Sequence, residues 1–252
     1  MMPVLPQAFL ARPLAHRALH DRAAGRPENS RAAVRAAIAQ GYGIEIDLQL
    51  SADGQAMVFH DDTLDRLTDQ SGPVRARDAA SLSQIQLTDA ADGIPTLAEV
   101  LEIVAGQVPL LIEIKDQDGA MGSDIGVLEQ ATARALHSYA GPVALMSFNP
   151  HTVERMAQLC PDRPVGMTTC SGSDSEFPQL TPAQRAPLAA IELADRISLD
   201  FISHDHSDLT NPRVAELKER GLPVLCWTIR SPEQEQAARR IADNVTFEGY
   251  AA

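Results

Sequence analysis

Short apolar runs recur along the 252-residue chain, and segments with helical patterns separate them. Apolar runs of this length are typical of parallel strands that are buried on both faces. Eight such strands are predicted, at 13–16, 43–49, 109–115, 142–148, 164–168, 198–203, 223–229 and 243–247. Helices are predicted between them at 31–40, 96–105, 124–139, 150–159, 182–192, 211–220 and 232–241.

Eight strand–helix units in about 250 residues match the size of an α/β fold of the (β/α)8 TIM-barrel type. An open doubly wound sheet is the alternative, but no GxGxxG motif opens the first helix, so a dinucleotide site has no support. The segment at about 51–96 is too long for an ordinary strand-to-helix loop. The sequence therefore predicts a single barrel domain over residues 1–252, with a small insertion after strand 2.

The composition limits the classes of partner. A net charge of −13 argues against a nucleic-acid surface or an anionic-membrane surface, either of which needs a basic patch. The three cysteines have no CxxC spacing, which indicates neither a zinc site nor a disulfide framework. Residues 1–14 lack a basic region, Pro3 and Pro6 interrupt them, and the chain has no apolar run of 18 residues. We therefore expect a cytoplasmic protein without stable membrane association.

The second predicted strand carries the first candidate chemistry. Glu45 and Asp47 alternate with apolar residues, so both carboxylates lie on one face of the strand. Two adjacent acids favour a hard divalent cation, Mg²⁺ or Ca²⁺, although a solvated edge strand would show the same alternation. His60 leaves the next apolar run, where it either transfers protons or has a structural role.

Other polar side chains follow the first and third strands. His16 and Arg17 come after strand 1, and Glu113 and Lys115 end strand 3. Catalytic groups of such barrels lie at the carboxyl ends of the strands. Three carboxylates make half a coordination shell, two cations can bind an anionic group, and two histidines supply an acid and a base. This set suits phosphoryl transfer better than glycoside hydrolysis, for which two carboxylates would suffice.

Several ordered motifs resemble those of the glycerophosphodiester phosphodiesterase family, in its bacterial cytoplasmic form. They are His16-Arg17, PENS at 27–30, Glu45-Ile-Asp47, HDDTLDRLT at 60–68, Glu113-Ile-Lys115 and the Trp227-Thr228 pair. The resemblance covers nearly the whole chain and implies a metal-dependent barrel hydrolase with a small inserted subdomain. Such an enzyme cleaves glycerophosphodiesters, which are small molecules, to sn-glycerol 3-phosphate and an alcohol.

The resemblance also implies roles for individual residues. Divalent-metal ligands are expected at Glu45, Asp47 and Glu113, and an acid/base pair at His16 and His60. Substrate or phosphate binding is expected at Arg17, Lys115, Glu28, Asn29 and Trp227. Glu28 and Asn29 belong to the surrounding polar shell, and Trp227 is either a core residue or a platform for the glycerol moiety.

One motif departs from the family pattern, and several residues have two interpretations. The family often closes with a TDxP-like ending, whereas residues 246–250 read TFEGY. Asp61 and Asp62 either orient His60 or are solvated. A solvated loop is the preferred interpretation of 204–206, with substrate contact as the alternative, while Met146 and Phe148 are expected to fill the barrel.

Two other functions compete with this interpretation. A phospholipase C or D type enzyme on the same barrel needs an apolar rim or a basic membrane-facing surface, and 4% aromatic content with a charge of −13 offers neither. A non-catalytic barrel that binds phosphorylated ligands would lack one histidine or acid of the set, and all are present. The preferred alcohol, the metal, the roles of the two histidines and the oligomeric state stay open.

Overall fold

Eight parallel strands close into a barrel in the computed structural model, which describes residues 5–252. The order is β1-β9-β8-β7-β6-β5-β4-β2, and β1 also pairs with β2, which completes the ring. The strands are β1 (Leu14–Ala15), β2 (Gly43–Leu50), β4 (Leu110–Ile114), β5 (Val143–Ser147), β6 (Val165–Thr169), β7 (Ile202–Asp205), β8 (Val224–Ile229) and β9 (Asn244–Phe247). The predicted barrel is confirmed. Residues 1–4, part of the segment in which no signal peptide is predicted, lie outside the described residues.

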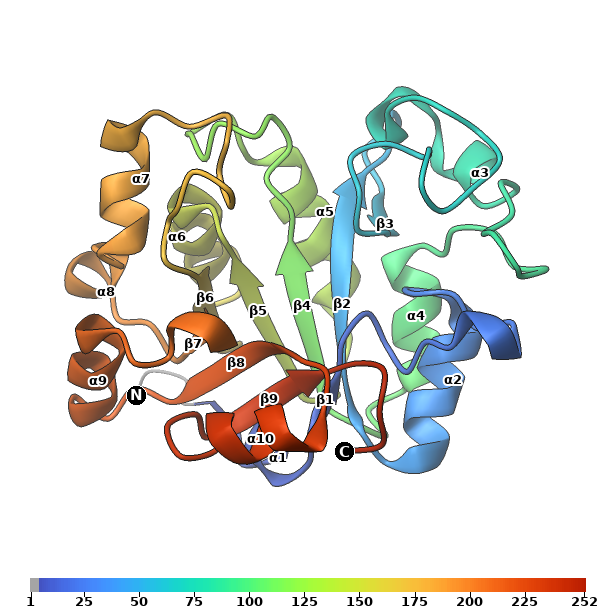
Figure 1. Cartoon of the computed structure of the whole chain (residues 1–252). Helices are drawn as coiled ribbons and strands as arrows, with labels where there is room; N and C mark the ends of the chain where they lie inside the picture. The colour runs from blue at the N-terminus through green and yellow to red at the C-terminus, as the bar shows by residue number, and fades with distance from the viewer. Residues whose placement is uncertain (1–4) are drawn as a thin grey trace.

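Helices surround the ring of strands (Figure 1). They are α1 (Ala8–Ala11), α2 (Arg31–Gln40), α3 (Ala79–Leu82), α4 (Leu97–Val104), α5 (Val127–Leu136), α6 (Pro150–Leu159), α7 (Pro182–Ala189), α8 (Leu193–Arg196), α9 (Pro212–Glu219) and α10 (Pro232–Ala238). The helix predicted at 182–192 ends earlier, because α7 stops at Ala189, and the separate helix α8 begins only after Ile191, which has a φ of 49°. No helix in the described part of the chain combines the length and the apolar run that a membrane crossing requires.

Local signals set the ends of the helices that carry the site loops. The Ser30 side chain accepts a hydrogen bond from Ala33 N at the start of α2, and Gly41 ends that helix at a φ of 70°. Thr96 and Glu99 form a reciprocal capping box at the start of α4. These caps hold the loop before α2 and the end of the insertion at defined places on the barrel.

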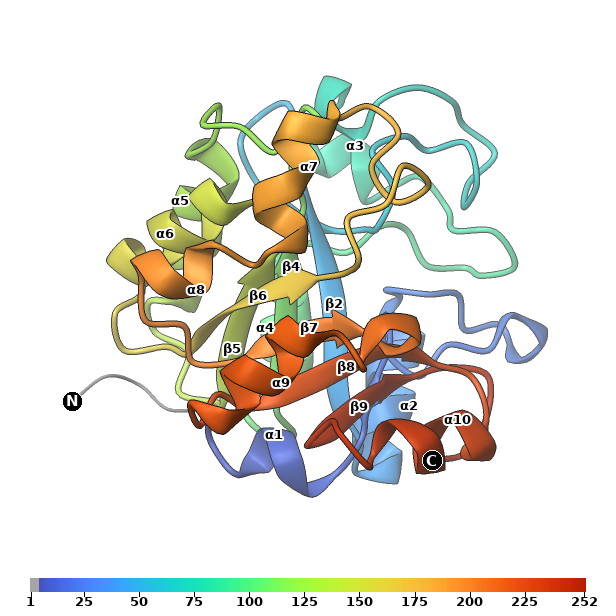
Figure 2. The ribbon, with the colours of Figure 1, turned by 60° about the vertical axis from the view of Figure 1, so that its left-hand side comes forward.

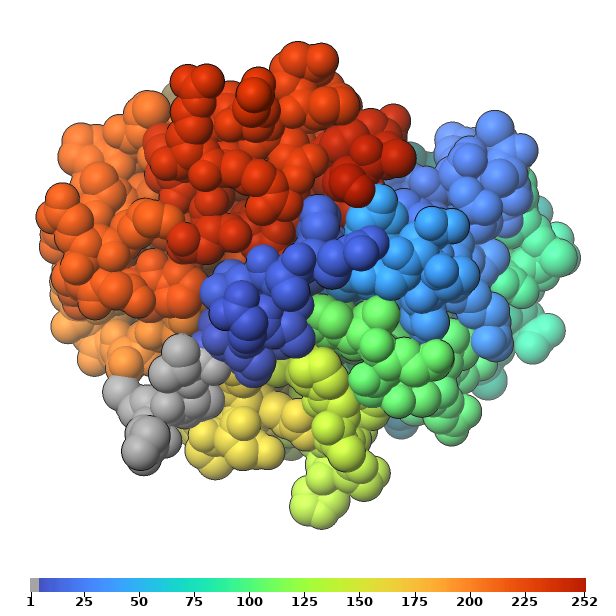
Figure 3. Space-filling view, turned by 90° about the horizontal axis from the view of Figure 1, so that it is seen from below, coloured from blue at the N-terminus to red at the C-terminus, as the bar shows by residue number. Residues whose placement is uncertain are grey.

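The N-terminal segment closes the bottom of the barrel. Figure 3 shows α1 at the centre of this face, surrounded by later parts of the chain. Phe9 is fully buried, and its carbonyl accepts a 2.6 Å hydrogen bond from the Asn244 side chain. The cluster around Phe9 includes Leu111, Phe201 and Leu225, whose side chains fill the barrel interior. The carboxyl ends of the strands therefore form the mouth.

The segment predicted as an insertion, 51–96, extends from the rim beside β2 (Figures 1 and 2). It contains strand β3 (Ala56–Val58), which pairs antiparallel with β2, and helix α3. It also has its own hydrophobic cluster, made of Met57, Phe59, Leu64, Leu67, Val74, Ala79, Leu82, Ile85, Leu87 and Ile94. His60 therefore leaves β3 on a unit with its own small core.

The bounds predicted for the strand at 198–203 are wrong, because β7 spans Ile202–Asp205. Leu199 and Phe201 are buried, which explains the apolar pattern, but they precede the strand. Asp200 sits between them, and its carboxylate accepts a 2.9 Å hydrogen bond from Val165 N. Buried apolar residues in this loop therefore give the same sequence pattern as a strand.

Candidate active site

Three carboxylates meet inside the mouth of the barrel. Glu45 and Asp47 come from β2, and Asp47 lies in register with Glu113 on β4. One oxygen of each of the three lies within 4.8 Å of the others, and the three residues are only 2%, 1% and 6% exposed. Burying like charges so close together is costly without a cation between them. The shared strand face predicted for Glu45 and Asp47 is present.

Lys115 neutralises only part of this negative charge. Its Nζ lies 2.8 Å from Asp47 Oδ1 and 2.6 Å from Glu113 Oε1. Burial opposes the ionised forms, but the two carboxylates raise the pKa of Lys115, and Lys115, His60 and Arg17 lower that of Asp47. Burial and the charges of Asp47 and Glu113 raise the pKa of Glu45 well above its usual range.

The carboxylate cluster fits a divalent cation. Oxygen ligands at this spacing suit Mg²⁺ or Ca²⁺. Lys115 contacts only Asp47 and Glu113, so a divalent cation among the three buried carboxylates would neutralise the remaining negative charge. Glu45, Asp47 and Glu113 could therefore hold such an ion with their own side chains.

Arg17 follows β1 and turns back over β2. Arg17 and Ala18 adopt positive φ angles of 52° and 63°, and their backbone N–H groups donate to the side chain and the carbonyl of Glu45, both at 2.9 Å. Arg17 Nη1 donates to Glu28 Oε1 at 2.8 Å, while Nε lies 3.7 Å from Asp47 Oδ2. That buried Nε–H has no hydrogen-bond partner among the described residues, so it is a donor available to a ligand.

The loop before α2 supports both β2 and Arg17. Asn29 has a φ of 57°, donates from Nδ2 to Asp47 Oδ2 at 2.9 Å, and donates its backbone N–H to the Arg17 carbonyl at 2.8 Å. Glu28 accepts from Arg17 on one side and from Arg66 on the other. Glu28 and Asn29 therefore lie beside Arg17 and Asp47 at the mouth.

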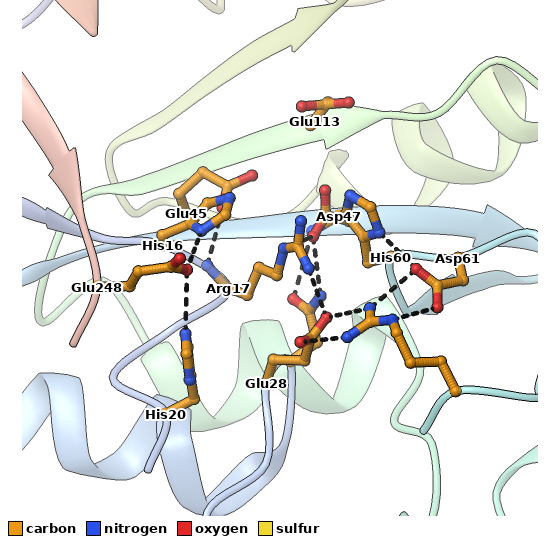
Figure 4. Close-up of polar contacts among 12 residues, drawn as sticks. His16, Arg17, His20, Glu28, Glu45, Asp47, His60, Asp61, Glu113 and Glu248 are labelled. Carbon is orange, nitrogen blue, oxygen red and sulfur yellow. Dashed lines mark hydrogen bonds and ion pairs between the residues drawn. The ribbon is translucent and has the colours of Figure 1, made fainter. Parts of the chain in front are cut away.

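His16 is held by a residue from the other end of the chain. Its Nδ1 lies 2.6 Å from Oε2 of Glu248, the first residue after β9 (Figure 4). Glu248 also contacts His20 Nε2 at 3.4 Å and accepts from Arg230 Nε at 2.8 Å. Burial lowers the pKa of His16, and the hydrogen bond with Glu248 opposes that effect. Burial would raise the pKa of Glu248, but its two histidine contacts lower it.

Glu248 lies at the mouth, but it is not among the site residues predicted from the sequence. It stands in the TFEGY ending, where the chain departs from the TDxP-like family pattern. An acidic residue at the carboxyl end of the last strand was the available signal, because all such ends meet at one rim.

His60 is held by its neighbour in the sequence. Asp61 Oδ1 lies 2.7 Å from His60 Nδ1, and Asp61 in turn accepts from Arg66. Gln49 on β2 donates to the His60 carbonyl at 3.0 Å, which ties this turn to the barrel. Asp61 thus orients His60, as one sequence interpretation proposed, whereas Asp62 is exposed.

A cavity of about 780 Å³ adjoins the carboxylate cluster. Glu113 and Lys115 line its inner side, Asp62 of the insertion lines another side, and Phe148 after β5 contributes an aromatic wall. The cavity thus connects the buried charges with the space beneath the insertion.

Two aromatic residues lie at the mouth rather than in the barrel core. Phe148 is half-buried and lines the cavity, so the prediction that it fills the barrel is wrong, whereas Met146 is buried in the interior cluster. Trp227 on β8 is also half-buried, with its Nε1–H donating to the Ser203 carbonyl at 3.0 Å. The two rings meet edge to face with their centroids 5.6 Å apart.

The predicted solvated loop at 204–206 is wrong for His204. This residue lies within β7 and is fully buried. Its Nδ1 pairs with Thr169 Oγ1 at 2.8 Å, and its Nε2 lies 3.2 Å from Asp208 Oδ2. Because β7 includes His204, this residue lies in the barrel wall, and these contacts satisfy both of its ring nitrogens.

The fold and the mouth together define a class of protein, the barrel hydrolases that act on anionic substrates. The model of the glycerophosphoryl diester phosphodiesterase family matches residues 16–246. The chain belongs to this family and is a glycerophosphodiester phosphodiesterase, a phosphoric diester hydrolase.

Individual relatives agree with this assignment. The chain is 31% identical over 232 residues to a glycerophosphodiester phosphodiesterase of Caldanaerobacter subterraneus, covering 87% of each chain. It is 25% identical to an Oleispira antarctica phosphodiesterase solved in complex with the product sn-glycerol-3-phosphate, with a TM-score of 0.74 over 96% and 94% of the two chains. The Thermotoga maritima glycerophosphodiester phosphodiesterase has the same fold, with 22% identity and a TM-score of 0.69 over 93% and 92%.

Proposed function

We propose that the mouth of this barrel hydrolyses glycerophosphodiesters to sn-glycerol 3-phosphate and an alcohol through His16 and His60. The observation that carries the proposal is the arrangement of the two histidines on either side of the buried carboxylate cluster (Figure 4). The Oleispira antarctica relative bound to sn-glycerol-3-phosphate supports this product. Each histidine has a carboxylate on Nδ1, which leaves Nε2 for proton transfer.

Glu45, Asp47 and Glu113 would hold Mg²⁺ or Ca²⁺ in this proposal. When bound, such a cation neutralises phosphate charge and lowers the pKa of a nearby hydroxyl or water. Arg17 and Lys115 bind phosphate oxygens, for which the unpartnered Nε–H of Arg17 is a ready donor. Glu28 and Asn29 hold Arg17 and Asp47 in place.

The position of the cavity supports an assignment of the two histidines. It is lined by Glu113 and Lys115 and by Asp62, two residues after His60, so in this proposal it receives the alcohol part of the diester. His60 then protonates the leaving oxygen as the general acid, and His16 removes a proton from the attacking oxygen as the general base. Trp227 provides an apolar surface for the glycerol part at the mouth.

The test measures release of glycerol 3-phosphate from glycerophosphocholine and glycerophosphoglycerol, with EDTA and with each divalent metal added back. We expect metal-dependent turnover that Glu45→Gln lowers by at least about 100-fold, because it removes one charged ligand. Glu102→Gln, on the exposed side of α4, is the matched control and keeps wild-type turnover. Titration calorimetry with Mg²⁺ checks binding directly. Turnover that resists EDTA would exclude the metal site, and metal-loaded protein that cleaves no glycerophosphodiester would exclude the function.

A further inference from the structure

Arg66, on the insertion, forms hydrogen bonds with two carboxylates near the mouth. Its Nε and Nη2 donate to Asp61 at 2.6 and 2.8 Å, and its Nη1 and Nη2 donate to Glu28 at 2.9 and 2.8 Å. One guanidinium thus makes four hydrogen bonds and lies between two carboxylates from different parts of the chain. The planar fork of arginine matches this paired geometry, which the single ammonium of lysine cannot reproduce.

Each of these carboxylates contacts a second residue of the site. Asp61 Oδ1 lies 2.7 Å from His60 Nδ1, and Glu28 Oε1 accepts from Arg17 Nη1 at 2.8 Å. These hydrogen bonds form a continuous chain that runs from His60 through Asp61, Arg66 and Glu28 to Arg17. We propose that Arg66 is a positioning residue that sets His60 and Arg17 at their working separation. The proposal rests on the function proposed above for those two residues.

The backbone that carries Arg66 is well anchored. Leu64 and Leu67 are buried in the hydrophobic cluster of the insertion, and Thr68 donates both its N–H and its hydroxyl to the Leu64 carbonyl at 3.1 and 2.9 Å. The Arg66 side chain is 47% exposed, so its four hydrogen bonds rather than burial hold the guanidinium in place. The guanidinium therefore links the insertion to Glu28 on the loop before α2.

Removing Arg66 has two predicted consequences. Asp61 and Glu28 lose the cation between them, so their like charges repel and both become free to move. His60 then loses its fixed orientation, which lowers kcat, and Arg17 loses its fixed position, which raises KM. Loss of a merely structural contact would instead lower stability and leave the kinetic constants of the folded protein unchanged.

Arg31 provides a matched control. It also joins the barrel to the insertion, donating to the Gly93 carbonyl at 2.8 Å and to both oxygens of Glu99 at 2.9 Å, and within residues 5–252 it makes no hydrogen bond to a site residue. We expect Arg66→Met to lower kcat/KM on glycerophosphocholine by about 10- to 100-fold, with both constants changed. Arg66→Lys should recover little of this loss, and Arg31→Met should stay within about twofold of wild type.

Side-chain ¹⁵N–¹H spectra of histidine-labelled protein add a readout that does not depend on turnover. At one fixed pH, Arg66→Met should change the tautomer signals of His60 while those of His151 on α6 stay the same. Unchanged His60 signals with wild-type kcat/KM would overturn the positioning role, as would equal kinetic losses in Arg66→Met and Arg31→Met. If wild type cleaves no glycerophosphodiester, the proposed function fails, and the His60 signals still decide whether Arg66 positions that ring.

Discussion

The two histidines of the mouth are supported in different ways. His60 takes its carboxylate from the next residue, Asp61, and both belong to the turn after β3 on the insertion. His16 takes its carboxylate from Glu248, which is 232 positions away along the chain and follows the last barrel strand. The first arrangement is local and depends on how the insertion is placed, whereas the second is built into the closure of the barrel.

The surroundings of the two pairs differ as well. Asp61 accepts from a two-armed guanidinium that also holds Glu28, so the His60 side is connected to Arg17. Glu248 accepts one hydrogen bond from the exposed Arg230 and is contacted by a second histidine, His20. We therefore expect the His60 side to respond to changes in the insertion, and the His16 side to respond to changes at Glu248 alone.

The largest effect should come from removing either ring, and the leaving group should separate the two roles. We expect His16→Ala and His60→Ala each to lower kcat on glycerophosphocholine by about 10²- to 10⁴-fold. On glycerophospho-p-nitrophenol, whose leaving group needs no proton, His60→Ala should recover most of this loss and His16→Ala should not. Recovery in His16→Ala instead would reverse the assignment, and recovery in neither would mean that no histidine protonates the leaving oxygen.

A smaller effect should follow when each carboxylate is replaced by its amide. Glu248→Gln and Asp61→Asn keep an acceptor in place but remove the charge that orients the ring, so we expect kcat to fall by about 10- to 100-fold. The hydrogen bond with Glu248 raises the pKa of His16 against the effect of burial. Without that charge the pKa falls further, so His16 stays neutral to lower pH. The limb of the pH–rate profile that His16 controls should therefore move to lower pH in Glu248→Gln.

The pH profile of the same variant provides the check. Two results for Glu248→Gln would contradict the proposed effect of Glu248 on the pKa of His16. One is a limb that moves to higher pH, and the other is a kcat that is lower at every pH while the limb stays at its wild-type pH. Asp162→Asn, an exposed acid with 76% of its side chain accessible, changes the net charge equally and is the control for general electrostatic effects.

The same contrast explains how much of the site could be predicted from the sequence. Asp61 follows His60 directly, so a contact between them was one of two interpretations available from the sequence alone. Glu248 meets His16 only because the barrel closes, and no local pattern relates residues 232 positions apart. Arg66 lies in a recognised motif, but its two carboxylate partners come from segments that meet only after the insertion has packed on β2.

The fold was predictable because buried parallel strands and capped helices leave strong local patterns. The bounds of α2 agree with the helix predicted at 31–40, and in the structure Ser30 and Gly41 cap this helix while Thr96 caps α4. β7 was misplaced because apolar residues in a buried loop give the same signal as a strand, and His204 was assigned to solvent as a consequence. Local sequence patterns thus indicate which segments are buried, but not which tertiary contacts those segments make.

The smallest predicted effect concerns Arg230, the counterpart of Arg66 on the His16 side. Its side chain is 58% exposed and reaches Glu248 through a single 2.8 Å contact, and exposed ion pairs of this kind contribute little. Since Glu248 is also contacted by two histidines, it keeps its position without Arg230, and Arg230→Gln should lower kcat/KM by less than about threefold. The measurement compares this variant with Arg66→Met and Glu248→Gln on one substrate at low and high salt. A loss as large as that of Glu248→Gln would show that the His16 side also depends on an outer arginine, and the proposed difference between the two sides would be wrong.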